Sequence, residues 1–390
     1  MSEEKKQEPR LLQILRESSP ATKILNAPGR DLGLADGEPF PFLAIIDQTE
    51  MKLALILSVI NPRIGGVLLI GSRGTAKTTA VRSLLDLLPR IRRSICPNGR
   101  GCTEEIFEAE GMEGVCNDCA RRAAYSEPLT DEKQMRIVEL PLNATISDVV
   151  GGINERAALE RQRVLIERGV LAQADDNLLY IDEVNLLDDA VMDAILDAAA
   201  QGFYTVRRGS NNLTYSSRFV LVGSMNPEEG ALRPQIMDRF GLRVVVRGLS
   251  DAESRYEAYE RAMWHRQDGA GMSASYAADT LELAAEIQRA ADLLPQVTLS
   301  EEAKRFGLSL VQQLQVESNR AEITLFEAAR ANAAADERIE ATPADVQAVA
   351  LMSLRQRQSP TLAKFFVEQA KEDTHLQKLI GGEDEHGSTD

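Results

Sequence analysis

Residues 67–79 read VLLIGSRGTAKTT, and this segment is the most informative in the 390-residue chain. Its apolar run, residues 67–70, suits a buried parallel strand. A glycine-containing loop over residues 71–76 follows, and helical spacing then continues from Thr79 towards Pro89. A loop between such a strand and such a helix is the context of a phosphate-binding loop, because backbone amides and the positive helix end face the anion. We therefore expect a nucleotide site here.

Two side chains at the end of this loop suit ATP and Mg²⁺. Lys77 is expected to reach the β- and γ-phosphates, and the Thr78 hydroxyl is expected to bind Mg²⁺. Ala76 stands where the commonest form of the motif has glycine, so the match departs by one methyl group. The residues expected to contact the nucleotide are Gly71, Ser72, Arg73, Gly74, Thr75, Ala76, Lys77, Thr78, Thr79 and Asp182.

Two further apolar runs end in polar side chains that suit hydrolysis. The first, residues 178–181, is followed by Asp182, expected to hold Mg²⁺ through water, and by Glu183, expected to polarise the attacking water. The second, residues 219–223, leads to Asn226, which could orient that water. Alone, the acidic pair could be a solvated strand end, and Asn226 with the proline that follows it could be a turn.

Strands that alternate with helices predict a parallel α/β sheet, here at residues 67–70, 177–181 and 218–223. From Asp251 onward the chain is rich in Ala, Glu and Leu, which predicts an all-α second domain. Ser300 and Thr342 are suitable helix caps. The predicted units are an N-terminal segment (1–38), an α/β core (39–250) with a cysteine-containing insertion at about 94–122, a helical domain (251–358), and a C-terminal helix with an acidic tail (359–390).

Charge and hydropathy exclude some classes of function. The formal net charge is −16, which disfavours a constitutive nucleic-acid binder, because basic surface supplies most of that affinity. Six of the first ten residues are charged, and no segment has the roughly 20 uninterrupted apolar residues of a membrane span. We therefore expect a cytoplasmic protein with no membrane span and no nucleic-acid partner.

Four cysteines lie within one short window of the chain: Cys96, Cys102, Cys116 and Cys119. Such clustering is more typical of a metal or thiol site than of a disulfide scaffold. Four thiolates can satisfy tetrahedral zinc, although only Cys116 and Cys119 have the preferred short spacing. Structural zinc, thiol–disulfide switching and inert cysteines all remain open at this point.

Together these motifs resemble an AAA+ ATPase, and within that superfamily the ATPase subunit I family of magnesium chelatase, in the helix-2-insert and MoxR-related group. The resemblance runs from about Phe40 to Gln358. The segments that carry it are FPF at 40–42, IIDQ at 45–48, IGGVLLIGSRGTAKT at 64–78, YIDEVNLL at 180–187, GSMNPEEG at 223–230 and LRPQIMDRFG at 232–241.

The resemblance implies roles for residues that the motifs alone leave unassigned. Arg239 corresponds to the arginine finger, which enters the site of a neighbouring subunit. Arg320 corresponds to the second sensor, which touches the γ-phosphate in its own subunit. A finger supplied by a neighbour implies a head-to-tail homo-oligomeric ring, in this family a hexamer. The resemblance also places the family's inserted helix at 151–174 and its hairpin at 204–217.

The implied function is that of an ATPase motor subunit, which acts with chelatase subunits D and H to insert Mg²⁺ into protoporphyrin IX during chlorophyll or bacteriochlorophyll synthesis. A rival is a MoxR-type chaperone that remodels a partner with a von Willebrand-type domain, because the Ala-Lys-Thr ending of the loop also occurs there. A DNA helicase related to minichromosome maintenance proteins is disfavoured by the acidic composition.

Overall fold

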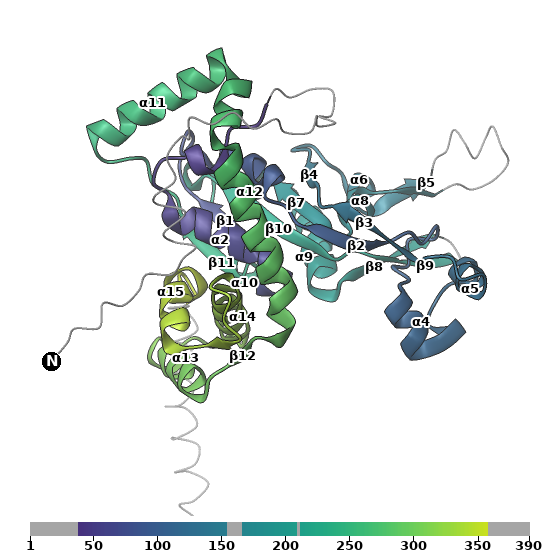
Figure 1. The fold of residues 1–390 in the computed structure, drawn as a ribbon. Helices are drawn as coiled ribbons and strands as arrows, with labels where there is room; N and C mark the ends of the chain where they lie inside the picture. The colour runs from purple at the N-terminus through teal and green to yellow at the C-terminus, as the bar shows by residue number, and fades with distance from the viewer. Residues whose placement is uncertain (1–37, 154–165, 209–210, 358–390) are drawn as a thin grey trace, which may run out of the picture.

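The computed structural model describes residues 38–153, 166–208 and 211–357 of the chain. A five-stranded sheet forms its centre, in the order β11-β1-β10-β7-β4, and all neighbouring strands in it are parallel (Figure 1). The strands are β1 (Val67–Ile70), β4 (Ile137–Leu140), β7 (Asn177–Ile181), β10 (Phe219–Met225) and β11 (Leu242–Val245). The three strands predicted from the sequence are thus confirmed as β1, β7 and β10.

Both faces of this sheet are buried. Side chains alternate between the faces along each strand, so Val67 and Leu69 of β1 join one apolar cluster, whereas Leu68 and Ile70 join another. This double burial explains why the sequence of β1 is continuously apolar. The first face is covered by α2 (Thr49–Ile60) and by the helices after residue 251, and the second by α6 (Ile146–Val150), α8 (Val170–Ala174), α9 (Asp189–Gln201) and α10 (Pro234–Arg239).

The chain after residue 251 is helical, as predicted. Its helices are α11 (Ala252–Gln267), α12 (Gly269–Leu293), α13 (Glu301–Gln313), α14 (Arg320–Ala335) and α15 (Pro343–Leu354), with one short pair of strands, β12 (Thr298–Leu299) and β13 (Glu340–Ala341). Ser300 caps α13, and Thr342 forms a capping box with Asp345, which confirms both predicted helix starts. None of the helices in the described part of the chain has the apolar length of a membrane span.

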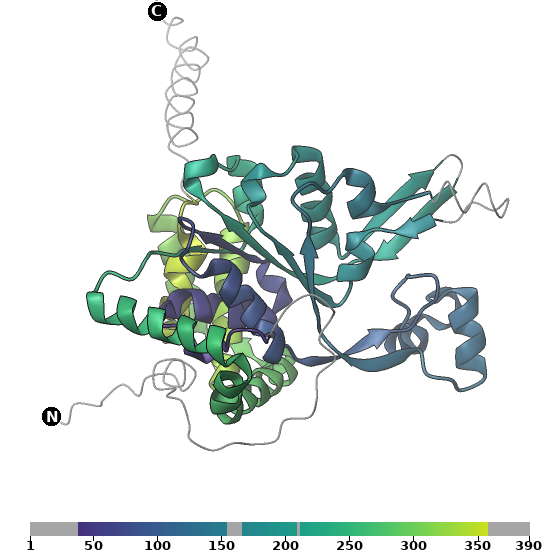
Figure 2. The same cartoon turned by 90° about the horizontal axis from the view of Figure 1, so that it is seen from above.

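An arm formed by residues 90–134 extends away from the sheet (Figure 2). Its stalk is an antiparallel pair, β2 (Arg90–Ser94) and β3 (Thr130–Gln134). Its tip, residues 95–129, holds α4 (Glu104–Glu110), α5 (Asn117–Ala124) and the four cysteines. The arm lies between α3 (Lys77–Arg82) and β4 in the chain, so it is inserted into the α/β core.

Two smaller hairpins flank the sheet. β8 (Phe203–Arg208) and β9 (Asn211–Ser216) pair antiparallel where the family resemblance implies a hairpin, at 204–217. Where an inserted helix is predicted, the described residues form the antiparallel pair β5 (Gly151–Ile153) and β6 (Ile166–Arg168), followed by α8. Residues 154–165 lie outside the described residues, as do the predicted C-terminal helix with its acidic tail and all but the last residue of the predicted N-terminal segment.

Candidate nucleotide site

The loop between β1 and α3 has the backbone path that a phosphate-binding loop needs. A Cβ atom at Gly71 would lie 2.2 Å from the carbonyl oxygen of Val246, so only glycine fits there. Gly74 has a φ of +76°, which also favours glycine. Lys77 folds back over the loop and donates hydrogen bonds to the carbonyls of Gly71 (2.6 Å) and Ser72 (2.8 Å). Its ammonium group is therefore held at the centre of the loop.

Ala76 adopts the conformation for which glycine is usual at this position. Its φ is +65°, a left-handed conformation that costs an L-residue about 1–2 kcal/mol. Glycine would avoid that cost but would lose about 0.5–1 kcal/mol through chain entropy. The two effects partly offset each other, so alanine at this position costs only about 1 kcal/mol or less relative to glycine.

Ala76→Gly is therefore expected to leave the free energy of unfolding unchanged or raise it by up to about 1 kcal/mol. Thermal unfolding with and without ADP measures this change. The control is Ala80→Gly inside α3, where the same substitution is expected to cost at least about 1 kcal/mol. An equal loss of stability in the two variants would contradict the conformational assignment of Ala76.

Asp182 accepts hydrogen bonds from three hydroxyl groups, which lie on β7, α3 and β10. Tyr180 donates to its Oδ1 (2.9 Å), Thr78 donates to its Oδ2 (3.2 Å), and Ser224 at the end of β10 also donates to Oδ1. The Tyr180 oxygen also lies 3.1 Å from Thr78 Oγ1, and burial raises the pKa of its phenol. The predicted magnesium ligands Thr78 and Asp182 thus lie in contact, and the neighbouring hydroxyls fix the carboxylate.

Tyr180 and Ser224 are site residues that the sequence analysis missed. Each is a polar exception within a mainly apolar strand, in the runs NLLYI, where Asn177 is the other polar residue, and FVLVGSM. Such a polar residue could have indicated a place in the site, because a buried hydroxyl usually has a hydrogen-bonding partner.

Glu183 follows Asp182 in a strained backbone conformation. Its φ is +52°, and its amide donates to Ser224 Oγ (3.2 Å). Its carboxylate lies 3.4 Å from the guanidinium of Arg73, which also pairs with Glu229 at 2.5 Å. Arg73 thus bridges the phosphate-binding loop to the ends of β7 and β10 at the rim of the site.

Asn226 lies at the same edge of the sheet, directly after β10, and is buried. Its side-chain oxygen accepts a hydrogen bond from the Glu228 amide (3.3 Å) and caps a short turn that begins with Pro227. Asn226 also lines the cavity formed by the phosphate-binding loop, Asp182 and Glu183. Its place in a turn is therefore compatible with a place in the site.

This cavity has a volume of about 220 Å³ and brings together most of the predicted site. It is lined by Arg73, Gly74, Thr75, Ala76, Lys77, Thr78, Thr79, Asp182, Glu183, Ser224, Met225 and Asn226. Burial lowers the pKa of Lys77, whereas the negative charges of Asp182, Glu183 and Glu229 act in the opposite direction. A cation and several carboxylates around a small cavity suit a phosphate chain with its divalent ion.

A second cavity, of about 440 Å³, adjoins the first and shares Gly74, Thr75, Ala76 and Thr79 with it. Its other lining residues include Phe40, Ile45, Ile46, Gln48, Arg247 and Leu249. Gln48 donates to the carbonyl oxygen of Arg247 (2.7 Å) and so joins its two sides. The polar cavity suits phosphates and the more apolar one suits a base and ribose, so together they fit a nucleotide.

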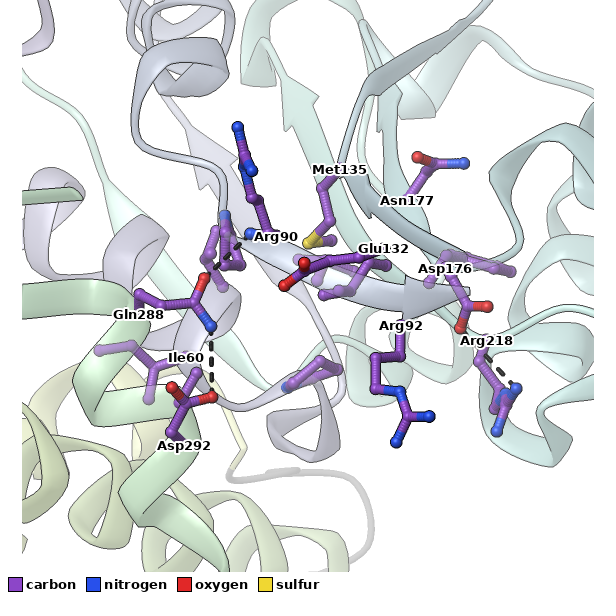
Figure 3. A pocket seen from close by; sticks show the side chains of 17 residues that line it. Ile60, Arg90, Arg92, Glu132, Met135, Asp176, Asn177, Arg218, Gln288 and Asp292 are labelled. Atoms are coloured by element: carbon purple, nitrogen blue, oxygen red, sulfur yellow. Dashed lines mark hydrogen bonds and ion pairs between the residues drawn. The ribbon is translucent and has the colours of Figure 1, made fainter. Parts of the chain in front are cut away.

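A third cavity, of about 670 Å³ and so larger than these two, lies at the opposite end of the sheet (Figure 3). It is lined by residues at the starts of β7 and β10, such as Asn177 and Phe219, and by Arg90, Arg92 and Gln288. Ligands of parallel α/β sheets bind outside the carboxyl ends of the strands, where the phosphate-binding loop lies. We therefore assign the nucleotide to the two smaller cavities beside the phosphate-binding loop, because of their position and their lining residues, although this third cavity is larger.

Neither predicted arginine lies among the residues that line the two nucleotide cavities. Arg239, at the end of α10, pairs with Asp197 of α9. Arg320 is the first residue of α14 in the helical domain.

Asp238 connects the helix that carries Arg239 to the helical domain. It accepts hydrogen bonds from Arg357 Nη1 (2.9 Å) and Ser318 Oγ (2.9 Å). The buried Arg357 also donates to the carbonyl oxygen of Gly241 (2.9 Å). The segment that leads into Arg320 is thereby attached to α10.

A parallel sheet with a phosphate-binding loop after β1, an acidic end of β7, a polar end of β10 and a following helical domain defines an AAA+ ATPase. A family model described as an AAA lid domain matches residues 308–379, and one described as magnesium chelatase, subunit ChlI, matches residues 151–251. The crystal structure of a putative ATPase from Cytophaga hutchinsonii shares the fold, with a TM-score of 0.50 and 20% identity over 80% of this chain and 83% of that one.

Comparison with curated sequences gives the family. The magnesium-chelatase subunit ChlI homolog of Methanocaldococcus jannaschii is 41% identical over 82% of this chain and 86% of its own length. The magnesium-chelatase subunit ChlI of a Synechocystis strain is 40% identical over 82% of this chain and 88% of its own length. The chain belongs to the ChlI family of magnesium-chelatase subunits.

Proposed function

We propose that this chain is the ATPase motor subunit of a magnesium chelatase, coupling ATP hydrolysis to insertion of Mg²⁺ into protoporphyrin IX. The observation that carries the ATPase part is the pair of adjoining cavities, one polar around Lys77 and Asp182 and one more apolar beside it. Membership of the ChlI family supports the chelatase part.

In the proposed mechanism, the loop amides and Lys77 bind the phosphate chain of ATP. Thr78 and Asp182 would hold the Mg²⁺ of the nucleotide, which neutralises charge on the β- and γ-phosphates when bound. The three hydroxyl contacts to Asp182 keep its carboxylate fixed for this task. Glu183 polarises the attacking water and Asn226 orients it, since both side chains line the phosphate cavity.

The site of one chain is proposed to be completed by a second copy. Arg239 lies outside the cavities of its own chain, in keeping with a finger that enters the neighbour's site. The family resemblance assigns Arg320 to the γ-phosphate of its own subunit, but Arg320 also lies outside the cavities of its own chain. We therefore propose instead that Arg320 serves the same neighbouring site, because the Ser318–Asp238 hydrogen bond joins its segment to the Arg239 helix. Head-to-tail contacts of this kind close into rings, and the family resemblance favours a hexamer.

The remaining parts of the proposal also come from the family resemblance. The ring acts in the cytoplasm with chelatase subunits D and H, and the porphyrin binds to the large catalytic component of the chelatase rather than to this chain. The product enters chlorophyll or bacteriochlorophyll synthesis. ATP and Mg²⁺ are the ligands proposed for the nucleotide site itself.

Reconstitution tests the chelatase proposal. When this chain, ATP and Mg²⁺ are added to the other two chelatase subunits of the same organism, fluorescence should reveal Mg-protoporphyrin formation, and the Lys77→Ala chain should abolish it. Rapid ATP hydrolysis without any Mg-protoporphyrin would contradict the chelatase role while leaving the ATPase role standing. Absence of ATP hydrolysis by the wild-type chain would contradict both.

A further inference from the structure

The tip of the arm gathers four thiols around one point. Cys96 and Cys102 lie after β2, Cys116 precedes α5, and Cys119 lies in its first turn. All four are buried and free, and their Sγ atoms lie within 4.8 Å of one another. Zn–S bonds of about 2.3 Å in a tetrahedron separate the sulfurs by about 3.8 Å. The Sγ atoms of Cys96 and Cys116 are 3.6 Å apart, which suits shared metal ligation and exceeds the length of a disulfide bond, about 2.05 Å.

The backbone around the cluster is shaped to hold the thiols inward. Residues Cys96 to Gly99 form a tight turn in which the Gly99 amide donates to the Cys96 carbonyl (3.1 Å). Gly99 and Gly101 have φ values of +65° and +70°, which favour glycine. This turn brings Cys96 and Cys102 back to the helix that carries the other two thiols.

Two N–H groups point at the sulfurs. The Cys116 amide donates to Cys102 Sγ (3.4 Å), and the Asn98 side chain donates to Cys116 Sγ (3.3 Å). Donors of this kind orient and stabilise thiolate ligands of metals.

The tip has only a small apolar core. α4 buries no residue, and α5 buries only Cys119. Apart from the cysteines, Val115 and Leu129 are the only buried apolar side chains within residues 95–129, all of which are described. A segment of this size with so small a core normally needs a disulfide or a metal.

The same turn contacts the β8–β9 hairpin, and Figure 1 shows α5 beside the end of β9. The Ser216 amide of β9 donates to the Gly99 carbonyl (2.9 Å), and Arg168 of β6 donates to the Pro97 carbonyl. The packing is close, because a Cβ at Gly101 would lie 2.8 Å from the Ser216 side chain. The position of the thiol cluster is thereby linked to that of the hairpin.

We propose that Cys96, Cys102, Cys116 and Cys119 bind one structural zinc ion, and that this ion holds the tip of the arm against the β8–β9 hairpin. Four thiolates with all coordination positions taken form a closed, structural type of site. Neither the binding of ATP nor the chelatase role is needed for this proposal.

Metal analysis of the full chain, purified without chelator, tests the site. We expect one zinc per chain, loss of most of it in Cys119→Ser, and retention in Asn117→Ser, the matched control on an exposed position of the same helix. Zinc-free wild-type protein, with four reactive thiols or with disulfides detected by mass spectrometry, would overturn the proposal.

Measurements on the wild-type chain keep the proposal testable even if Cys119→Ser fails to fold. A mercurial reagent should release one zinc as four thiols are modified, and Co²⁺ refilling should give the absorption bands of tetrahedral thiolate cobalt. Removal of the metal should increase the rate of amide hydrogen exchange several-fold in residues 95–129, 203–208 and 211–216. The rate in residues 67–82 should not change. Unchanged exchange in the hairpin would overturn its link to the metal.

Discussion

Glu183→Gln is expected to lower ATP turnover by about 10²–10⁴-fold, the usual contribution of a general base. Affinity for ATP should change little, because glutamine keeps the volume of the side chain and leaves Lys77, Thr78 and Asp182 in place. The amide cannot accept a proton from water, so only the hydrolytic step is affected. Phosphate release at saturating ATP measures turnover, and titration with a fluorescent ATP analogue measures binding.

Glu229→Gln provides the matched control for this prediction. Glu229 pairs with the same arginine, Arg73, and has a similar exposure, 18% against 22% for Glu183. It does not line the phosphate cavity. Its substitution removes the same charge, yet we expect a much smaller effect on turnover. Equal losses in the two variants, or normal turnover in Glu183→Gln, would contradict the role of Glu183.

Arg239→Ala is expected to lower turnover by about 10³–10⁵-fold, the range typical of an arginine finger. Mixing this variant with Lys77→Ala should restore activity, because a chain with an intact loop can then meet a neighbour with an intact finger. Random assembly of equal amounts makes about one quarter of the interfaces competent in a head-to-tail ring. ATP turnover across a series of mixing ratios measures the recovery.

Two controls distinguish action on a neighbour from a role within the chain. Lys77→Ala mixed with the double variant Lys77→Ala/Arg239→Ala offers no competent interface and should stay inactive. Asp197→Ala removes the ion-pair partner of Arg239 within the chain and should leave turnover largely intact. If assembled mixtures of the two single variants stayed inactive, or if Asp197→Ala matched the loss in Arg239→Ala, the finger assignment would be wrong.

The central strands could be predicted from the sequence, whereas the arm could be predicted only as a cysteine-containing insertion at about 94–122, without the two strands of its stalk. β1, β7 and β10 are buried on both faces, so each is a continuous apolar run. β2 and β3 read RIRRS and TDEKQ, because they pair with each other outside the core and carry mostly charged side chains. Their strand structure depends on pairing between segments about 40 residues apart, which local hydropathy does not report.

The phosphate side of the site was predictable because its residues are adjacent in the chain or end an apolar strand. The second cavity was not, since Ile45 and Arg247 meet only through the fold. The family resemblance includes residues 45–48, but it offers no physical reason for their role. The cysteines were visible as a group, and their convergence on one point required the turn at Gly99 and the start of α5.

The hydrogen bonds of Asp238 connect the helical domain of one subunit to the arginine that is proposed to act in the next subunit. Because Asp238 holds Ser318 and Arg357 and directly precedes Arg239, a shift of the helical domain in one subunit would carry that subunit's arginine with it. That arginine is proposed to enter the nucleotide site of the next subunit. A movement of the helical domain would therefore affect the site of one neighbour and not the other. Asp238 would then affect ATP hydrolysis in the neighbouring subunit, although it lies outside both nucleotide cavities of its own chain.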